Sequence, residues 1–593
     1  MAQHSEPTGI QPSERSPLLA KTAPANGQRV VSPSVEAAAE SAGVPASESI
    51  RGNGSVSRNG RDDEESQHQG QVDGKEARNG HVARIISVLL IGIFVAHADG
   101  SILLATHPVI ASEFNDLENS SWLITSFSLA GAATQTLYGR LSDIYGRKTL
   151  VIVAYVIFVL GCTLVAMGQT MWQVVLGRIV SGAGASGMAG LVSILITDLL
   201  PIREVAQWRA YVNLVATLGR SIGGPLGGWL VDIIGWRWSF FGQVPPILLA
   251  IFLVTVSLPG SQATSSSSDG VDDRISGKSK ISRVDFKGSF LFTLGILAFL
   301  LPIELGGVKL PWSHPAIVSL FCLSFVLLSI FVAVEKRQDE PILPLGIFQR
   351  RDAVLSYAIL GLQVAAQLGL MFSVPLYFQI TTRSSNTASG AHLVPAVVGN
   401  AIGGLISGVI IKRSGRYKTL IISAVALSSL SYLLLMLRWH GNTNFWESLY
   451  IFPSGFGTGI AQSAVFVSLQ AVIAAQDPSY LAPAISFMYL TTTLGIMLGV
   501  PLSNAVMQSA LRRSLWSRLL GLGIGRDKIA KIVENTVSDV NFVDHITGRV
   551  RDAVVGSYVD GLWWSHGVSF LFSTTAFVLA LFLRQRPLDG PRA

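Results

Sequence analysis

The chain has 593 residues, of which 49% are hydrophobic and only 14% are charged, and its net formal charge is +7. Soluble globular proteins carry about 25% charged residues, so the composition argues against a soluble enzyme and is typical of a helical membrane protein, in which glycine is also frequent. The basic residues lie in short loops between apolar runs, and membrane topology therefore explains the positive charge more simply than nucleic-acid binding does.

Residues 1–82 are rich in Ser, Gly, Asn, Glu and Arg and lack apolar periodicity, so we expect a disordered cytoplasmic tail. The tail contains ERSPLL, which resembles the acidic dileucine signals that sorting adaptors read on proteins bound for vacuoles and lysosomes. Its key residues are Glu14, Leu18 and Leu19. A six-residue match also arises by chance, and that alternative stays open.

From Arg84 onward, apolar runs of roughly 20 residues recur, each long enough to cross a ~30 Å hydrocarbon core as a helix. We expect an all-α polytopic membrane protein with about fourteen spans, although twelve or thirteen remain open. Basic residues gather in alternate loops, such as those that we expect to hold Arg147, Arg203 with Arg209, and Lys412. The positive-inside rule therefore predicts that both termini are cytoplasmic.

The runs group into two blocks of six spans with two extra spans between them. The segment that connects the last two spans contains VMQSALRRSLWSRLLGLG, which has the amphipathic pattern of a helix lying on the outer membrane surface. The predicted boundaries are a first block at 83–258, a cytoplasmic linker at 259–285, two extra spans at 286–335, a cytoplasmic loop at 336–351, a second block at 352–584 with a long outer or lumenal loop at 508–561, and a cytoplasmic tail at 585–593.

Asp99 falls in the middle of the first apolar run. A carboxylate in a low-dielectric site can gain or lose a proton when a cation binds nearby, so Asp99 is a candidate for exchanging a proton against a cationic substrate. A structural ion pair with Arg178 or Arg220 is the alternative. His97 lies about 200° around the helix from Asp99 and is interpreted as a packing residue.

Asn119 begins an Asn-Ser-Ser triplet, a candidate glycosylation site close to the membrane.

The stretch YGRLSDIYGRKTL places a charged, glycine-marked turn between two apolar runs. Gly139 and Gly146 permit close backbone approach and a tight turn. Asp143 can pair with Arg147 or with a cation on a neighbouring helix, and Lys148 adds positive charge. A merely topogenic basic loop is the alternative interpretation. The stretch GVIIKRSGRYKTLII, residues 408–422, repeats this pattern, as expected for a transporter built from two related halves.

Two arginines lie within predicted spans, where charge is costly and often functional. Arg178 belongs to LGRIVSGAGASG in the fourth span, and Arg220 belongs to GRSIGGPLGGWL in the fifth. Snorkelling of either side chain to the interface is the alternative. For Arg220 a substrate contact and an ion pair with an acid on a facing helix both stay open.

These motifs together resemble the major facilitator superfamily. GRLSDIYGRK is similar to its loop signature, and Arg178 matches the fourth-helix arginine that the family links to proton coupling. GRSIGGPLGGWL resembles the antiporter signature through Gly224, Pro225, Gly227 and Gly228, but Gly219 lies five residues before Gly224 and Arg220 intrudes. Asp99 matches the first-helix acid of the fourteen-span drug:H⁺ antiporters.

The resemblance implies two six-helix bundles plus two extra helices and a secondary transporter that is not an enzyme and needs no cofactor. Its partners would be a small-molecule substrate, protons, the lipid bilayer and a sorting adaptor, with no nucleic acid, and it would act as a monomer. The pattern is most similar to fungal vacuolar basic amino acid transporters, which implies H⁺-driven movement of Lys, His or Arg into the vacuole. A plasma-membrane exporter of drugs or toxins and a non-transporting nutrient sensor are the alternatives.

Overall fold

The computed structural model describes residues 59–588 apart from 117–118, 121, 259–284, 307–309, 339, 385, 476 and 539. The chain divides into two compact units, Met1–Gln71 and Val72–Ala593. Apart from the start of helix α1, the described residues lie in the second unit. The predicted sorting residues Glu14, Leu18 and Leu19 lie outside the described residues.

Helix α1 runs from Asn59 to Glu113. Residues 59–82, which the sequence assigned to a disordered tail, are therefore helical. Glu, Gln, Arg and Lys, which are good helix formers, make up nine of these 24 residues, against four glycines. The prediction of disorder relied on the absence of apolar periodicity. Apolar periodicity indicates whether a helix has a face that can be buried, and it does not indicate whether a helix can form.

The first block of helices follows the predicted apolar runs closely. Inside a hydrocarbon layer every backbone N–H and C=O must be bonded within the segment, which selects helices for such runs. Local signals set the ends: the Thr170 side chain accepts a hydrogen bond from the Gln173 backbone N–H at the start of α4. The helices of this block after α1 are α2 (Trp122–Tyr145), α3 (Arg147–Met167), α4 (Met171–Leu199), α5 (Ile202–Ile234), α6 (Trp236–Phe241) and α7 (Val244–Ser257).

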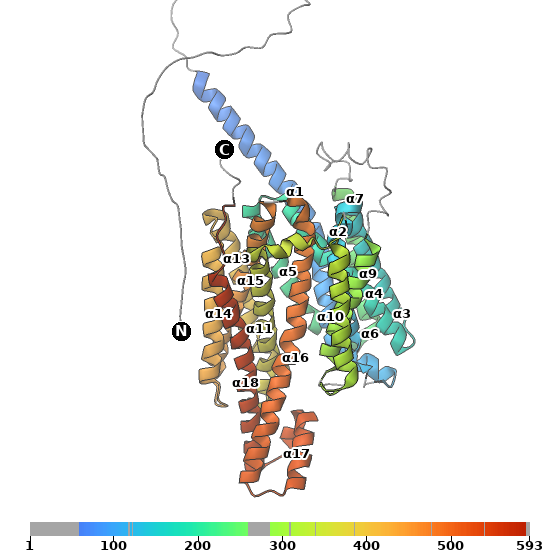
Figure 1. Ribbon diagram of the computed structural model, residues 1–593, viewed down its shortest axis with the longest axis vertical. Coiled ribbons are helices and arrows are strands. Elements are labelled where there is room, and N and C mark those ends of the chain that lie inside the picture. The colour runs from blue at the N-terminus through green and yellow to red at the C-terminus, as the bar shows by residue number, and fades with distance from the viewer. Residues whose placement is uncertain are drawn as a thin grey trace, which may run out of the picture. The chain divides into compact units, whose positions relative to one another are not determined.

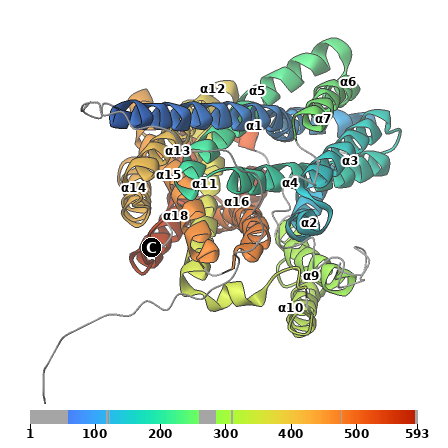
Figure 2. The ribbon, with the colours of Figure 1, turned by 90° about the horizontal axis from the view of Figure 1, so that it is seen from above.

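Two helices, α9 (Phe286–Leu305) and α10 (Pro315–Glu335), separate this block from the second one. They pack on each other, and α9 also contacts α2 and α16. Figure 2 places both on the α2 side of the bundle. The second block contains α11 (Arg351–Thr382), α12 (Asn386–Ala391), α13 (Val394–Ser414), α14 (Lys418–Arg438), α15 (Phe452–Ala474), α16 (Leu481–Gly521), α17 (Arg526–Ser538) and α18 (Gly548–Leu581), with 3₁₀ turns at Leu345–Gln349, Phe445–Ile451, Pro478–Tyr480 and Val540–His545.

The two blocks meet along two seams, α5 against α13 and α15, and α2 against α16. We call the end of the bundle that carries the α2–α3 loop the inner end and the end that carries α17 the outer end (Figure 1). The sequence predicts that the inner end faces the cytoplasm.

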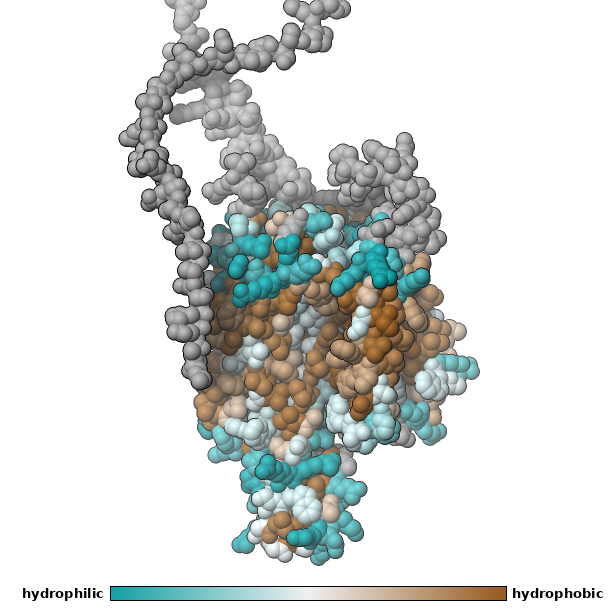
Figure 3. Space-filling model, viewed as in Figure 1, coloured by the Kyte–Doolittle hydropathy of each residue, from teal (hydrophilic) through white to brown (hydrophobic). Residues whose placement is uncertain are grey.

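Twelve helical segments among the described residues are long and apolar enough to cross a membrane. Figure 3 shows apolar side chains over the middle of one face of the bundle and polar side chains towards both ends. The helices α2 and α5 are 24 and 33 residues long but are not among the twelve. Both carry hydroxyl or charged side chains along their length, as expected of helices that line a path between two halves. The count of fourteen spans remains a prediction.

Glycines bring the helices into close contact. A Cβ on Gly459 of α15 would collide with the backbone carbonyl oxygen of Asn400 on α13, and one on Gly455 would collide with that of Ala396. On the other side of the molecule, a Cβ on Gly184 of α4 would lie 2.5 Å from the Phe158 backbone nitrogen on α3. Because lipid tails are as apolar as leucine, such close packing is a main source of helix association in a membrane.

The segment 508–561 is mostly helical instead of an extended loop. The stretch with the amphipathic pattern continues α16 to Gly521, so it does not form a separate helix lying on the membrane surface. Its apolar stripe is covered by α17 and the start of α18, in a small core that includes Leu515, Ile529 and Tyr558. The apolar side of the amphipathic pattern is therefore covered by protein.

Substituting Gly459 by Ala should destabilise the protein by about 1–3 kcal/mol, because the added methyl group forces the α13 and α15 backbones apart. The thermal unfolding midpoint of the purified protein in detergent measures the loss. Gly390→Ala is the matched control, since Gly390 lies in helix α12 with no atom within 4 Å of the Cβ position. Equal midpoints for the two variants would contradict the close packing of α13 against α15.

Candidate functional site

Two charged side chains pair in the interior of the first block. The Nη1 atom of Arg178 on α4 donates to both carboxylate oxygens of Asp99 on α1, at 3.0 and 2.7 Å. Asp99 is 0% and Arg178 1% exposed. The pair is electrically neutral as a unit, and either member alone would be an uncompensated charge in a low-dielectric interior.

The rest of the arginine is also enclosed. Its Nε atom donates to the Leu123 backbone oxygen at 3.3 Å, and its guanidinium lies 4.3 Å from the centre of the Phe127 ring on α2. The ring of Phe240 is 5.7 Å away on the other side. Hydrogen bonds and aromatic faces therefore fix the orientation of Arg178, and it does not snorkel to an interface.

A row of glycines on α5 presses α1 into this position. Cβ atoms on Gly219, Gly223 and Gly227 would lie 2.6, 2.5 and 2.9 Å from backbone atoms of Phe94, Ala98 and Ile102. The spacing of four residues is the small-x-x-x-small pattern of close helix pairs. Gly219 and Gly227 were noted in the sequence as part of the motif, but Gly223 and the role of the row as a helix seam were not predicted.

The predicted antiporter residues are distributed over different faces of α5. Gly227 belongs to the seam, Pro225 is exposed, and a Cβ at Gly228 would have no atom within 4 Å. One residue, Leu226, separates Pro225 from Gly227, so this copy also departs from the two-residue spacing of the family pattern. The nearest atom to a Cβ at Gly224 is the Ser101 backbone oxygen at 3.9 Å.

Arg220 does not pair with Asp99. Its side chain is exposed, and within the described part of the chain we find no hydrogen bond or ion pair for it. Arg209, Asn213 and Arg220 lie on one stripe of α5, since steps of four and seven residues return to the same helix face. His97, interpreted as a packing residue, bonds to the Ile93 backbone oxygen at 2.9 Å.

The α2–α3 turn holds the predicted cluster of charges at the inner end. Arg147 pairs with Asp143 at 2.6 Å and with Asp198 of α4 at 2.9 Å. Lys148 donates to the Thr255 and Leu258 backbone oxygens at 2.7 and 2.6 Å, at the end of α7.

Backbone conformation or close packing favours glycine at both predicted glycine positions of that turn. Gly146 has φ of +90°, which favours glycine. A Cβ on Gly139 would lie 2.8 Å from the Ala482 backbone oxygen at the start of α16, in the other block. The turn therefore ties α2, α3, α4 and α7 together and lies against the second block.

The repeated turn in the second block makes contacts of a different kind. Lys412, at the position of Asp143 in the repeat, reaches across to Glu204 of α5 at 3.4 Å. A Cβ on Gly408 would lie 2.6 Å from the Cα of Gln207.

In the first copy Asp143 and Arg147 pair within their block, while Arg140 pairs with Glu340 of the loop before the second block at 2.8 Å. In the second copy Lys412 bonds to the other block.

Arg209 forms a second connection between the blocks, which the sequence analysis missed because it counted this residue among the loop charges. Its Nη1 atom donates to the Ser193 hydroxyl at 2.6 Å and also to the Tyr489 hydroxyl of α16. Its guanidinium lies 4.2 Å from the centre of the Phe466 ring on α15. We call Arg209, Ser193, Tyr489 and Phe466 the inner latch.

The α5–α13 seam is closed towards the inner end. Asn213 donates to Asn400 across the seam at 2.6 Å, and a Cβ on Gly404 of α13 would lie 3.7 Å from the Ala210 side chain. Further out on α5, Arg220 is exposed, and Gly228, about 80° around the helix from it, has open space beside it. The blocks are therefore in contact at the inner end, while α5 is uncovered towards the outer end.

Asn119, the candidate glycosylation residue, lies between α1 and α2. Its side-chain amide donates to Asp116 at 2.8 Å.

Glu113 at the end of α1 accepts hydrogen bonds from the Trp236 indole and from Arg237, which hold the pKa of Glu113 below its usual value.

The comparisons with known proteins agree with this architecture. The family model of the Major Facilitator Superfamily matches residues 89–381 and 353–519. The vacuolar membrane amino acid uptake transporter fnx2 of Schizosaccharomyces pombe is 30% identical over 516 residues, covering 86% of this chain and 85% of fnx2. The vacuolar basic amino acid transporter 2 of Saccharomyces cerevisiae is 26% identical, covering 78% and 97%. The multidrug resistance protein fnx1 of S. pombe is 28% identical, covering 84% and 92%.

Solved structures share the fold at low identity. The proton:xylose symporter XylE superposes with a TM-score of 0.54 at 13% identity, over 86% of this chain and 98% of its own. The chain belongs to the Major Facilitator Superfamily. It is a multi-pass membrane transporter of that family, as the sequence motifs predicted.

The Asp99–Arg178 pair should show strong coupling in a double-mutant cycle. Arg178→Gln leaves a buried carboxylate without its partner and should cost about 3–5 kcal/mol of stability. Adding Asp99→Asn removes the second charge, so the double variant should lose less than the two single losses combined, by at least ~1 kcal/mol. Chemical unfolding in detergent measures the cycle, and additive losses would contradict a shared buried pair.

Weakening the inner latch should expose the inner end. Tyr489→Phe removes the hydroxyl that accepts from Arg209. A thiol at Ala210, which is 1% exposed, should then react about tenfold or more faster with a water-soluble reagent, because the loss of a hydrogen bond to a charged donor costs ~1.5–3 kcal/mol.

The labelling is done in permeabilised membranes with Ala210→Cys in a background in which Cys162 and Cys322 are replaced. Ser509→Cys, an exposed site on α16, is the control. An increase of the same size at the control, or none at Ala210→Cys, would show that Tyr489 does not hold the inner end closed.

Proposed function

We propose that the protein is a proton-driven antiporter of the vacuolar membrane that moves basic amino acids such as lysine, histidine or arginine into the lumen. Relatives whose names state vacuolar amino acid transport align over most of the chain. With the inner end in the cytoplasm, the open side of α5 faces the lumen.

The observation that supports proton coupling best is the burial of the Asp99–Arg178 pair. Protonation of Asp99 would cancel the carboxylate charge and leave the Arg178 guanidinium uncompensated, at 1% exposure. A lone buried charge is unfavourable by several kcal/mol, so the protonated state favours any rearrangement that gives Arg178 a new partner or water. Proton binding is in this way linked to a change in the packing of α1 against α4.

Asp99 is enclosed in this conformation and both of its oxygens bond to Arg178. A cationic substrate reaches it only after α1 and α4 have moved. Arg220 is an exposed charge on the outer part of α5, and its guanidinium has the geometry to bind the α-carboxylate that all amino acids share. The proton site and the first substrate contact are thus separate.

The test is uptake of labelled lysine, histidine and arginine into vacuolar vesicles under an imposed pH gradient. Wild type should accumulate at least one of them. Asp99→Asn should lower gradient-driven accumulation by about tenfold or more, the factor that corresponds to ~1.4 kcal/mol of lost coupling. Normal transport with normal proton dependence in Asp99→Asn would exclude the proposed role of Asp99.

Glu113→Gln is the matched control, because Glu113 is a carboxylate at the outer end of α1 that pairs with Arg237 at the surface. Arg220→Gln should raise the substrate KM with little effect on proton dependence. No flux of any substrate in the wild type would favour a non-transporting sensor.

An exporter of drugs at the plasma membrane is the second candidate, since fnx1 carries the name of a multidrug resistance protein. Dyes are therefore included among the test substrates. Residence in the plasma membrane, unaffected by replacing Leu18 and Leu19, together with dye transport, would favour this candidate over the vacuolar one.

A further inference from the structure

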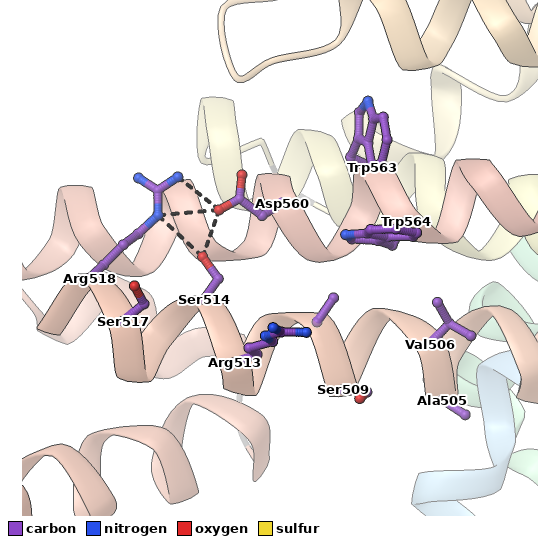
Figure 4. A pocket seen from close by; sticks show the side chains of 11 residues that line it. Ala505, Val506, Ser509, Arg513, Ser514, Ser517, Arg518, Asp560, Trp563 and Trp564 are labelled. Carbon is purple, nitrogen blue, oxygen red and sulfur yellow. Dashed lines mark hydrogen bonds and ion pairs between the residues drawn. The ribbon is translucent and has the colours of Figure 1, made fainter. Parts of the chain in front are cut away.

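A groove of about 840 Å³ lies between α16 and α18, away from the Asp99–Arg178 pair (Figure 4). One part of its lining is apolar, with Val506, Trp563 and Trp564. Another part is polar, with Ser509, Arg513 and the Arg518–Asp560 pair. Neither the proton site nor the inner latch uses these residues.

The tryptophans mark the depth of the groove in the membrane. The Trp563 indole donates to the Met436 backbone oxygen at 2.9 Å, near the end of α14. The 21 residues of α14 span about 30 Å, the thickness of the hydrocarbon core, so Trp563 lies at its outer edge. Tryptophan is enriched at this interface. Other exposed tryptophans at outer helix ends are Trp172, Trp238 and Trp446.

The two arginines that line the groove differ in whether they pair with a carboxylate of the described residues. Arg518 pairs with Asp560 at 2.8 Å, and Ser514 donates to the same carboxylate at 2.6 Å. Arg513 is exposed, and we find no hydrogen bond or ion pair for it within the described residues. The three charged residues of the lining therefore leave one net positive charge, on Arg513.

Arg513 lies seven residues beyond Val506, or about 10 Å further out along the helix. Helical side chains lean towards the N-terminus of their helix, and the N-terminus of α16 is at the inner end. The Arg513 side chain accordingly points along α16 towards Trp564, whereas Arg518 turns towards Asp560 (Figure 4). The guanidinium thus leans back to the level at which lipid headgroups lie.

We propose that this groove binds a phospholipid of the outer leaflet, with the headgroup phosphate on Arg513 and an acyl chain against Trp564 and Val506. An arginine matches a phosphate with two parallel hydrogen bonds. The hydroxyl of Ser509, one turn towards the membrane, adds a further donor. The single positive charge complements the single negative charge of a phosphodiester.

The test uses the full chain in detergent and measures binding of dioctanoyl phosphatidylglycerol by native mass spectrometry. Arg513→Gln should weaken binding about tenfold, the effect of losing a charge-assisted hydrogen bond. Arg512→Gln is the matched control, since Arg512 is the adjacent exposed arginine and does not line the groove. Equal weakening by both substitutions would show diffuse attraction and overturn the proposal.

Two further ligands test separately whether the phosphate and the acyl chains contribute to the binding affinity. Inorganic phosphate and dioctanoylglycerol each supply one half of the recognised molecule, and both should bind at least tenfold more weakly than the phospholipid. Phosphate binding as tight as the lipid would identify a site for soluble anions. Equally tight binding of dioctanoylglycerol would identify an apolar groove without headgroup recognition, and either result would overturn the proposal.

Discussion

The structure depends on one constraint: Asp99 and Arg178 are charged, adjacent and almost completely shielded from water. In a low-dielectric interior two such charges are stable only together, so α1 and α4 are held in a single register as long as both are ionised. The packing of the neighbouring helices also holds α1 and α4 in this register. The glycine row of α5 presses on α1, and the glycines of α4 lie against the backbone of α3. Close packing of this kind allows few intermediate arrangements, so a change in the charge of the pair favours a discrete movement of helices over a gradual one.

The two copies of the charged turn show how related halves come to differ in function. In the first copy Asp143 accepts from Arg147, and the turn ties the helices of its own block together. In the second copy Lys412 stands at the corresponding position and reaches Glu204 of the other block. At this position the first copy therefore makes a contact within its block, and the second copy makes a contact between the blocks. Contacts between blocks must be broken when the blocks move, whereas contacts within a block keep each block rigid during the movement.

Much of this arrangement was predictable from the sequence, because apolar runs, glycine-marked turns and charges inside spans are local signals. They identified the helical membrane fold, the Arg147 cluster and the two interior charges Asp99 and Arg178. The choice of Arg178 over Arg220 as the partner of Asp99 was not predictable, since it depends on which faces of α1, α4 and α5 meet. Arg209 was counted as a loop charge because it lies close to the end of a run. The extension of α16 was interpreted as a surface helix because an amphipathic pattern does not say whether lipid or protein covers its apolar side.

Helix α5 connects the separate parts of the site. Its glycine row contacts α1 next to Asp99, its inner end carries Arg209 of the inner latch, and Arg220 lies on its open outer part. A shift of α1 that follows protonation of Asp99 must either carry α5 with it or open the glycine seam. If α5 moves, it pulls Arg209 away from Tyr489 and changes the position of Arg220 in the same step. Moving α5 with α1 preserves the glycine seam between them and opens the α5–α13 seam, where Gly408 lies against Gln207. In the proposed mechanism, protonation of Asp99 would therefore act on both the closure of the inner end and the position of Arg220, although Asp99 contacts neither.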